Sequence, residues 1–94
     1  MNTFSFDELK AVRQIAITDA LQADIQTAAE ESFPDDEGVT FTITRAVAAN
    51  NTRYVEIIPD MDTGYKKYVF ELNTENSVIM CYAFGDGIYT LLFD

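Results

Sequence analysis

The hydrophobic period of this 94-residue chain changes once, at an acidic loop formed by residues 34–38, and that change limits the folds it can adopt. Before the loop, residues 6–33 contain neither glycine nor proline, and their apolar side chains recur at a helical spacing. After the loop, apolar and polar residues alternate, and turn-forming residues separate the alternating runs. The pattern therefore predicts a helical segment followed by an antiparallel sheet.

Several local signals mark the start of the predicted helix. Ser5 and Glu8 have the spacing of a capping box, and Phe4 and Leu9 can pack together as a hydrophobic staple. Pro34 ends the run, because the residue before a proline is pushed out of the α region. These signals predict a helix over residues 6–32.

The apolar stripe of this segment shifts near Thr18 and Asp19. Leu9, Val12 and Ala16 share one face, whereas the apolar residues after position 17 line a face rotated by about 120°. We favour one helix over residues 6–32. The alternative is a helix that kinks or restarts, with Thr18 or Asp19 as a second N-cap.

The second half of the chain divides into runs with strand character. The first run extends from Val39 to Val47, and the next four cover residues 53–58, 65–72, 78–84 and 88–93. Short turns join them, which is typical of an antiparallel meander. The predicted fold class is therefore α+β, with one N-terminal helix packed on a five-stranded antiparallel meander sheet in a single domain, residues 1–94.

The composition argues against most catalysis. The chain has no histidine, so the side chain whose ordinary pKa lies nearest neutrality is missing as a general base or metal ligand. Its lone cysteine, Cys81, lies in an apolar run that predicts an inert, packed thiol. No glycine pattern for phosphate or dinucleotide binding is present. We therefore expect no enzymatic activity and no cofactor.

One metal-binding pattern is incomplete. Asp60, Asp62 and Glu71 fall at positions 1, 3 and 12 of an EF-hand calcium loop. However, Gly64 stands at position 5 and offers no side-chain oxygen, and Tyr65 stands where the loop requires glycine. The flanking residues have strand rather than helix character, so we expect a hairpin turn and no metal site.

The charges are unevenly distributed. The formal net charge is −10, and between Gln14 and Thr44 the chain carries seven acidic residues and no basic one. This acidic window predicts a binding surface for a basic protein partner, whereas direct contact with nucleic acid is disfavoured by repulsion from phosphate. The alternative is a solvated face that keeps the protein in solution. The predicted acidic patch consists of Asp19, Asp24, Glu30, Glu31, Asp35, Asp36 and Glu37.

The last two predicted strands are apolar on both faces, although a sheet covered by one helix should have one polar face. Either an end of the helix wraps the second face, or an apolar patch contacts another chain, for example in a homodimer. On this alternation Val78, Met80, Tyr82 and Phe84 share one face. The predicted apolar interface consists of Met80, Tyr82, Phe84, Tyr89, Leu91 and Phe93.

Small acidic α+β proteins without catalytic residues are similar to the inhibitors that bacteriophages make against host defences, including some anti-restriction and anti-CRISPR proteins that mimic nucleic acid. The resemblance covers size, charge and architecture, and no residue motif carries it. It implies a stoichiometric inhibitor, or an adaptor, that occupies the basic, nucleic-acid-binding groove of another protein. The alternative function is a homo-oligomeric accessory protein. No apolar run is long enough to span a membrane, and we expect a cytoplasmic location.

Overall fold

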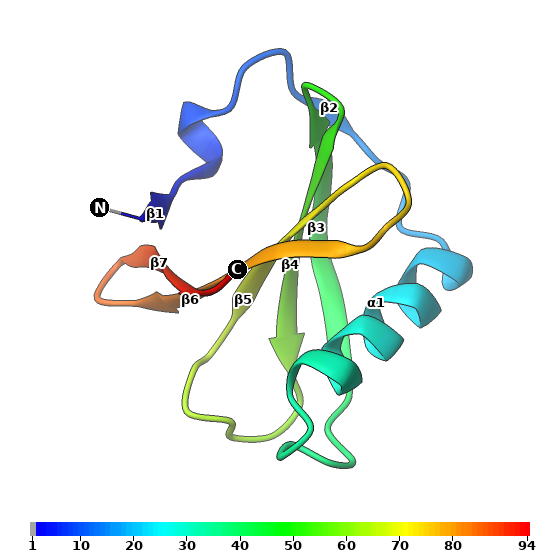
Figure 1. Ribbon diagram of the computed structural model, residues 1–94, viewed down its shortest axis with the longest axis vertical. Helices are drawn as coiled ribbons and strands as arrows, with labels where there is room; N and C mark the ends of the chain where they lie inside the picture. Colours follow the sequence, from blue (N-terminus) through cyan, green and yellow to red (C-terminus); the bar gives the residue numbers. More distant parts are fainter. Residues whose placement is uncertain (1) are drawn as a thin grey trace.

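The computed structural model describes residues 2–94 and shows an α+β fold (Figure 1). A 3-10 helix covers Phe6–Glu8 and the α-helix α1 covers Asp19–Ser32. The strands are β1 (Thr3–Phe4), β2 (Arg13–Gln14), β3 (Phe41–Ala49), β4 (Thr52–Pro59), β5 (Tyr68–Leu72), β6 (Val78–Gly85) and β7 (Ile88–Phe93).

The strands form one antiparallel sheet in the order β1-β7-β6-β5-β4-β3-β2. Its centre is the five-stranded meander β3 to β7 that the alternation predicts. Two short strands from the N-terminal segment extend the sheet at both edges, so it has seven strands rather than five. Figure 1 shows β6 and β7 crossing the direction of β3 and β4, because the sheet is strongly twisted.

The predicted continuous helix over residues 6–32 is wrong. The alternative N-cap at Thr18 is correct, but within residues 2–94 a 3-10 turn and a strand, rather than a first α-helix, precede it. The capping signal at Ser5 produces a 3-10 turn that ends at Leu9, whose backbone is extended. After a left-handed residue at Ala11, the chain pairs with β3 as β2. Thr18 then caps α1 by accepting a hydrogen bond from the Leu21 amide at 3.1 Å. The change of apolar face marked this boundary.

Two tight turns fix the register of the meander. Asn50 and Asn51 both have positive φ between the paired residues Ala49 and Thr52, the conformation of a two-residue type I′ hairpin. Asp86 and Gly87 form the same turn between β6 and β7. Asparagine, aspartate and glycine are the residues that tolerate this backbone, so both turns follow from local sequence.

The two faces of the sheet are covered by different parts of the chain. Helix α1 covers one face with Leu21, Ile25 and Ala29, all buried. The N-terminal segment covers the other face, where Phe4 stacks on Tyr54 at 5.0 Å between ring centroids and also contacts the rings of Tyr82 and Tyr89. The second face is therefore covered by residues that the sequence pattern assigned to the start of the helix.

Three β-bulges decide which side chains face the helix. Each bulge adds one residue to a strand: Thr44 in β3, Ile79 in β6 and Leu92 in β7. Because an extra residue reverses the alternation, Val78 and Phe93 pack on the helix side of the sheet. The expectation that Val78 shares a face with Met80 is therefore wrong.

Side-chain amides join α1 to the edge of β3. Gln26 accepts a hydrogen bond from the Phe41 amide at 2.8 Å and donates to the Val39 carbonyl at 2.9 Å. Gln22 accepts from the Ile43 amide at 3.0 Å and donates to the Phe41 carbonyl. Four residues of helix rise about 6 Å and two residues of strand about 6.7 Å, so the two spacings match. The glutamines thereby take the place of a neighbouring strand.

No helix within residues 2–94 combines the length and the apolar character that a membrane span requires.

We expect Gln26→Ala to lower the free energy of unfolding by about 1 to 3 kcal/mol, because it leaves backbone groups of β3 without partners. The Phe41 amide should also exchange its hydrogen faster. Urea unfolding and hydrogen exchange measure both effects. Gln14→Ala is the control, since Gln14 is exposed, and it should change neither quantity. Equal stability of the two variants would contradict the proposed role of Gln26.

Candidate functional site

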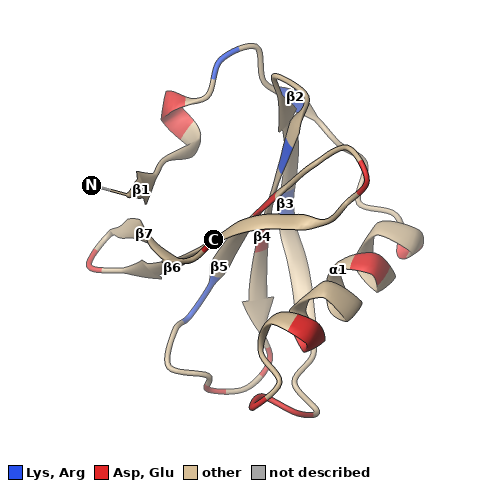
Figure 2. Cartoon of the chain, in the orientation of Figure 1, with Lys and Arg blue, Asp and Glu red and all other residues tan. Residues whose placement is uncertain are grey.

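The four residues of the predicted acidic patch that lie in α1 are exposed but divided between two sides of the helix. Asp24 and Glu31 lie on the side toward β6, about 10 Å apart along the helix axis. Asp19 and Glu30 lie about 120° around the helix, on the side toward β3. There Glu30 accepts a hydrogen bond from Gln26 at 3.0 Å. Figure 2 shows acidic residues along α1 and in the loop that follows it.

The acidic residues of the loop after α1 lie beyond the end of the helix. Asp35 and Glu37 are exposed, and Asp36 is half-buried. The Asp36 amide donates to the Phe33 carbonyl at 3.0 Å, and the Asp36 carbonyl accepts from the Val39 amide, so the loop is folded into turns. The structure therefore places the seven acidic residues on three surfaces, of which the one toward β6 is hollowed.

A groove of about 650 Å³ lies between α1 and the strands β6 and β7. Asp24 and Glu31 line it from the helix, and Glu75 and Asp94 line it from the β5–β6 loop and the C-terminus. Its apolar lining includes Val78, Ile79 and Phe93. The groove thus combines two residues of the predicted acidic patch with one residue of the predicted apolar interface, Phe93.

Local hydrogen bonds hold the loop that carries Glu75 in its conformation. The Asn73 carboxamide oxygen accepts from the amides of Glu75 and Ser77 at 2.9 and 3.0 Å. Arg53 donates to the Asn76 carboxamide oxygen at 2.7 Å and anchors the loop to β4. The sequence prediction missed Glu75 and Asp94, because they lie outside the acidic window and join the groove through the tertiary fold. An isolated acidic residue of this kind gives no local sequence signal for a binding site.

Among residues 2–94 the cation nearest to the groove lining is that of Arg53, which lies behind Asn76 and donates to its carboxamide. No lysine or arginine lines the groove. Within residues 2–94 the one ion pair lies elsewhere, between Lys67 and Glu56 at 3.9 Å on the second face. The carboxylates of Asp24, Glu31, Glu75 and Asp94 have no ion-pair partner within residues 2–94, so they surround an apolar surface with negative charge that attracts a cation.

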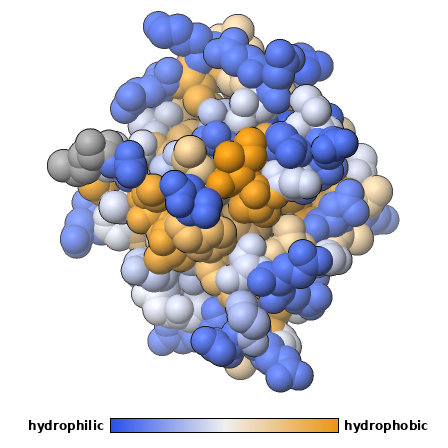
Figure 3. All heavy atoms as spheres, viewed as in Figure 1, coloured by the Kyte–Doolittle hydropathy of each residue, from blue (hydrophilic) through white to orange (hydrophobic). Residues whose placement is uncertain are grey.

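The predicted apolar interface does not form one surface. Tyr82 and Tyr89 are buried in the second face beneath Phe4, with Met80, Phe84 and Leu91 packed around them. Phe93 packs on the helix side, with its ring 5.9 Å from that of Phe33. Figure 3 shows apolar side chains gathered near the middle of one face of the molecule, bordered by polar residues.

The half-buried carboxylate of Glu56 on the second face has structural partners. It accepts hydrogen bonds from Tyr89 and, at 2.8 Å, from the Thr44 hydroxyl. Burial raises the pKa of Tyr89, and the hydrogen bond to Glu56 raises it further. Because each Glu56 oxygen already has a donor, this carboxylate ties strands together rather than offering a free acid or base.

The aspartates of the incomplete EF-hand pattern act as turn residues. Asp60 accepts a hydrogen bond from the Thr40 amide at 3.0 Å, and Asp62 accepts one from the Gly64 amide at 2.9 Å. Glu71 lies in β5, paired with Tyr54 and Met80. Within residues 2–94 no three metal-ligating side chains gather in one place.

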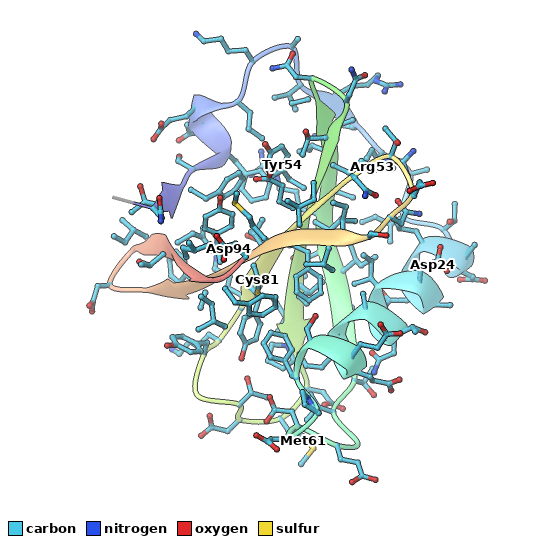
Figure 4. The ribbon with its side chains drawn as sticks, viewed as in Figure 1. Asp24, Arg53, Tyr54, Met61, Cys81 and Asp94 are labelled. Carbon is cyan, nitrogen blue, oxygen red and sulfur yellow. The ribbon has the colours of Figure 1, made fainter. Side chains whose placement is uncertain are left out.

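Cys81 is fully buried in the helix-side core. Figure 4 shows it among the side chains in the middle of the molecule, whereas Asp24 points outward from α1 and Met61 lies at the tip of the β4–β5 loop. Burial raises the pKa of the Cys81 thiol to about 12. The thiolate is therefore scarce at neutral pH, as expected for an inert cysteine.

Comparison of the chain with protein-family models, with characterised proteins and with solved structures finds no match. The groove and the surface around it are therefore the features of the molecule that bear on its function.

We expect Cys81 in the folded protein to react with iodoacetamide at least about 100-fold more slowly than in the urea-unfolded chain at the same pH, because attack requires an accessible thiolate. Mass spectrometry of timed samples measures both rates. Similar rates in the two states would show that the cysteine is reactive.

We expect Glu71→Gln to stabilise the protein near neutral pH relative to the wild type. Burial raises the pKa of Glu71, and the Tyr82 hydroxyl offsets only part of that shift. Because the folded-state pKa lies above the unfolded value, wild-type stability is lost as the pH rises through it. The advantage of the glutamine variant should therefore grow from about pH 4 to pH 7 in urea unfolding. An advantage that does not change with pH would contradict this assignment.

Proposed function

We propose that this chain is a non-enzymatic interaction module whose groove between α1 and β6 binds a cationic segment of a partner protein. The observation that carries the proposal is the arrangement of Asp24 and Glu31 on one wall and of Glu75 and Asp94 on the other, with no lysine or arginine among the lining residues that the structure describes. Basic residues on a bound segment would neutralise the carboxylates of both walls at once.

The apolar lining of the groove limits the kind of partner segment that can bind there. Ile79 is 39% exposed and lies beside the partly buried Val78 and Phe93. An apolar side chain flanked by lysine or arginine would cover this surface while its neighbours contact the carboxylates. Charge would speed the encounter, and burial of the apolar side chain would slow dissociation.

Basic segments with these features occur on proteins that bind nucleic acid, because the same cations contact phosphate. A chain with a formal net charge of −10 that occupied such a surface would exclude nucleic acid from it and act as a stoichiometric inhibitor. This role matches the phage anti-defence inhibitors that the chain resembles in size and charge. Competition between the chain and a short DNA duplex for a captured partner would test the inhibitory part.

A second candidate function is a homo-oligomeric accessory protein. It is favoured by the large apolar side chains that stay exposed in the monomer, among them Met61, Tyr65 and Ile88.

We expect neutralisation of the groove to weaken binding of a labelled peptide of alternating lysine and leucine. The variant carries Asp24→Asn, Glu31→Gln and Glu75→Gln. Loss of three exposed charge contacts, each contributing up to about 1 kcal/mol, should lower the affinity about tenfold or more. The dependence of affinity on salt should also decrease. Fluorescence anisotropy at two salt concentrations measures both.

The matched control is Asp35→Asn, Glu37→Gln and Asp86→Asn, which removes the same charge from exposed residues outside the groove. It should retain affinity within about threefold, because distant charges are screened at physiological salt. If the two variants lose affinity equally, net charge rather than the groove governs binding. If neither loses affinity, the proposed site is wrong.

A further inference from the structure

One segment of the sheet has a neighbouring strand on one side only. Strand β6 lies between β5 and β7, and β5 pairs with it from Val78 to Ala83. Strand β7 pairs with β6 only as far as Cys81. Within residues 2–94, no strand therefore pairs with Val78–Met80 on the β7 side. We call this segment the β6 edge.

Other parts of the sheet edge are covered. Strand β1 pairs with β7 through Thr3 and Phe4, and β2 pairs with the end of β3. Gln22 and Gln26 bond to the backbone at the start of β3. An uncovered strand edge presents N–H and C=O groups that pair readily with another chain. The β6 edge is therefore a place where a further strand can be added.

The β6 edge opens into the groove between α1 and β6. Val78 and Ile79 line this groove, and so do Phe93 and Asp94 at the end of β7. Figure 1 shows β6 continuing beyond the end of β7 toward the β5–β6 loop. A strand paired with the β6 edge would thus lie in the groove and continue the line of β7, and three residues of it would span about 10 Å.

The unpaired backbone of the β6 edge determines which conformation of a bound segment suits the groove. A segment that covers this edge removes water from its free backbone groups, and each buried group then needs a new hydrogen-bond partner. A helical segment has none to offer, because its own backbone groups bond to one another. An extended segment supplies N–H and C=O groups at the strand spacing, as in peptide recognition by strand addition.

The side chains around the β6 edge determine which sequence suits such a strand. Successive side chains of a strand point to opposite faces of the sheet. On the helix face they meet the carboxylates of Asp24 and Glu31 over the apolar Val78 and Phe93. Lysine and arginine suit this position, because their stems are apolar and their ends are charged. On the other face the side chains lie beside Met80, which suits apolar residues.

A second copy of this chain is a poor occupant of the β6 edge. If two copies paired through this edge, each would bring its own groove carboxylates to the contact, and each carries a formal net charge of −10. Like charges at a strand edge oppose pairing between identical chains. The same carboxylates attract a basic strand, so charge selects the partner.

We infer that the groove binds its partner by strand addition: an extended segment with alternating basic and apolar residues pairs with the β6 edge in line with β7. The inference rests on the proposed function, because it specifies the conformation and the sequence pattern of the segment that the groove binds. Main-chain hydrogen bonds to β6 then supply affinity, and the alternate side chains supply specificity.

Peptides methylated on backbone nitrogens test strand addition. In an extended peptide of alternating lysine and leucine, the amides of all lysines point to one edge and those of all leucines to the other. One isomer carries N-methyl groups on its lysines, and its matched control carries the same number on its leucines. One of the two should lose affinity at least about tenfold, whereas the other should stay within about threefold of the unmethylated peptide. Equal effects in the two isomers, measured by fluorescence anisotropy, would overturn the inference.

A rearranged peptide gives a second measurement. It contains the same lysines and leucines at a helical period, so that the two residue types separate on a helix but mix on the faces of a strand. Its charge equals that of the alternating peptide, so general attraction to the acidic protein is matched. The alternating peptide should bind at least about tenfold more tightly. Equal or tighter binding of the rearranged peptide would overturn the inference.

Hydrogen exchange locates the added strand. Because the N–H groups of a strand alternate between its two sides, pairing at the β6 edge should slow amide exchange within residues 78–80 at least about tenfold in the complex with the alternating peptide. The amides of the β4–β5 loop are the control and should exchange at the rate of the free protein. Unchanged exchange within residues 78–80 would overturn the inference.

The inference and the proposed function fail in different ways. If all the peptides bind equally to the wild type but more weakly to the variant with Asp24→Asn, Glu31→Gln and Glu75→Gln, strand addition fails and the proposed function stands. If only one methylated isomer is weakened and exchange slows within residues 78–80, while neutralisation of the groove leaves affinity unchanged, recognition by charge fails and strand addition stands. Absence of any peptide binding overturns both.

Discussion

Helix α1 is joined to the sheet by hydrogen bonds as well as by apolar packing, because Gln22 and Gln26 bond to the open backbone of β3. Apolar packing alone would allow the helix to slide along the sheet, since burial has no direction. The amide pairs fix its position along the strand and its rotation about its own axis. That rotation turns Asp24 and Glu31 toward β6, so the groove depends on bonds made on the opposite side of the helix.

The N-terminal segment determines which side chains of the apolar C-terminal hairpin are buried. When a helix is assigned to residues 6–32, Tyr82 and Tyr89 are predicted to be exposed interface residues. In the fold they are buried, because Phe4 and Phe6 pack across them and Arg45 lies over the Phe6 ring at 4.1 Å. Apolar surface stays open at the groove and around Met61 and Tyr65 of the β4–β5 loop, neither of which the N-terminal segment lines.

The bulges and the loop before β6 assemble the groove from distant parts of the chain. The bulge at Leu92 brings Phe93 to the helix side, and the bulge at Ile79 exposes that residue at the groove. Glu75 adds its charge from a loop that Asn73 holds in place. Two residues of the predicted acidic patch, Asp24 and Glu31, thus meet one residue of the predicted apolar interface, Phe93, at the groove, which favours a partner segment with both basic and apolar residues.

Local sequence determined the features that depend on residues close together in the chain. The alternation located the five central strands, the paired asparagines at Asn50 and Asn51 determined one hairpin turn, and Thr18 and Pro34 bounded the helix. Tertiary structure decided the rest. Whether residues 6–18 continue a helix or pair with strand edges depends on partners far along the chain, and the sheet offered more hydrogen bonds and apolar area than an isolated helical turn. Bulge positions and the set of acids around the groove are likewise fixed by cross-strand packing, which no local spacing encodes.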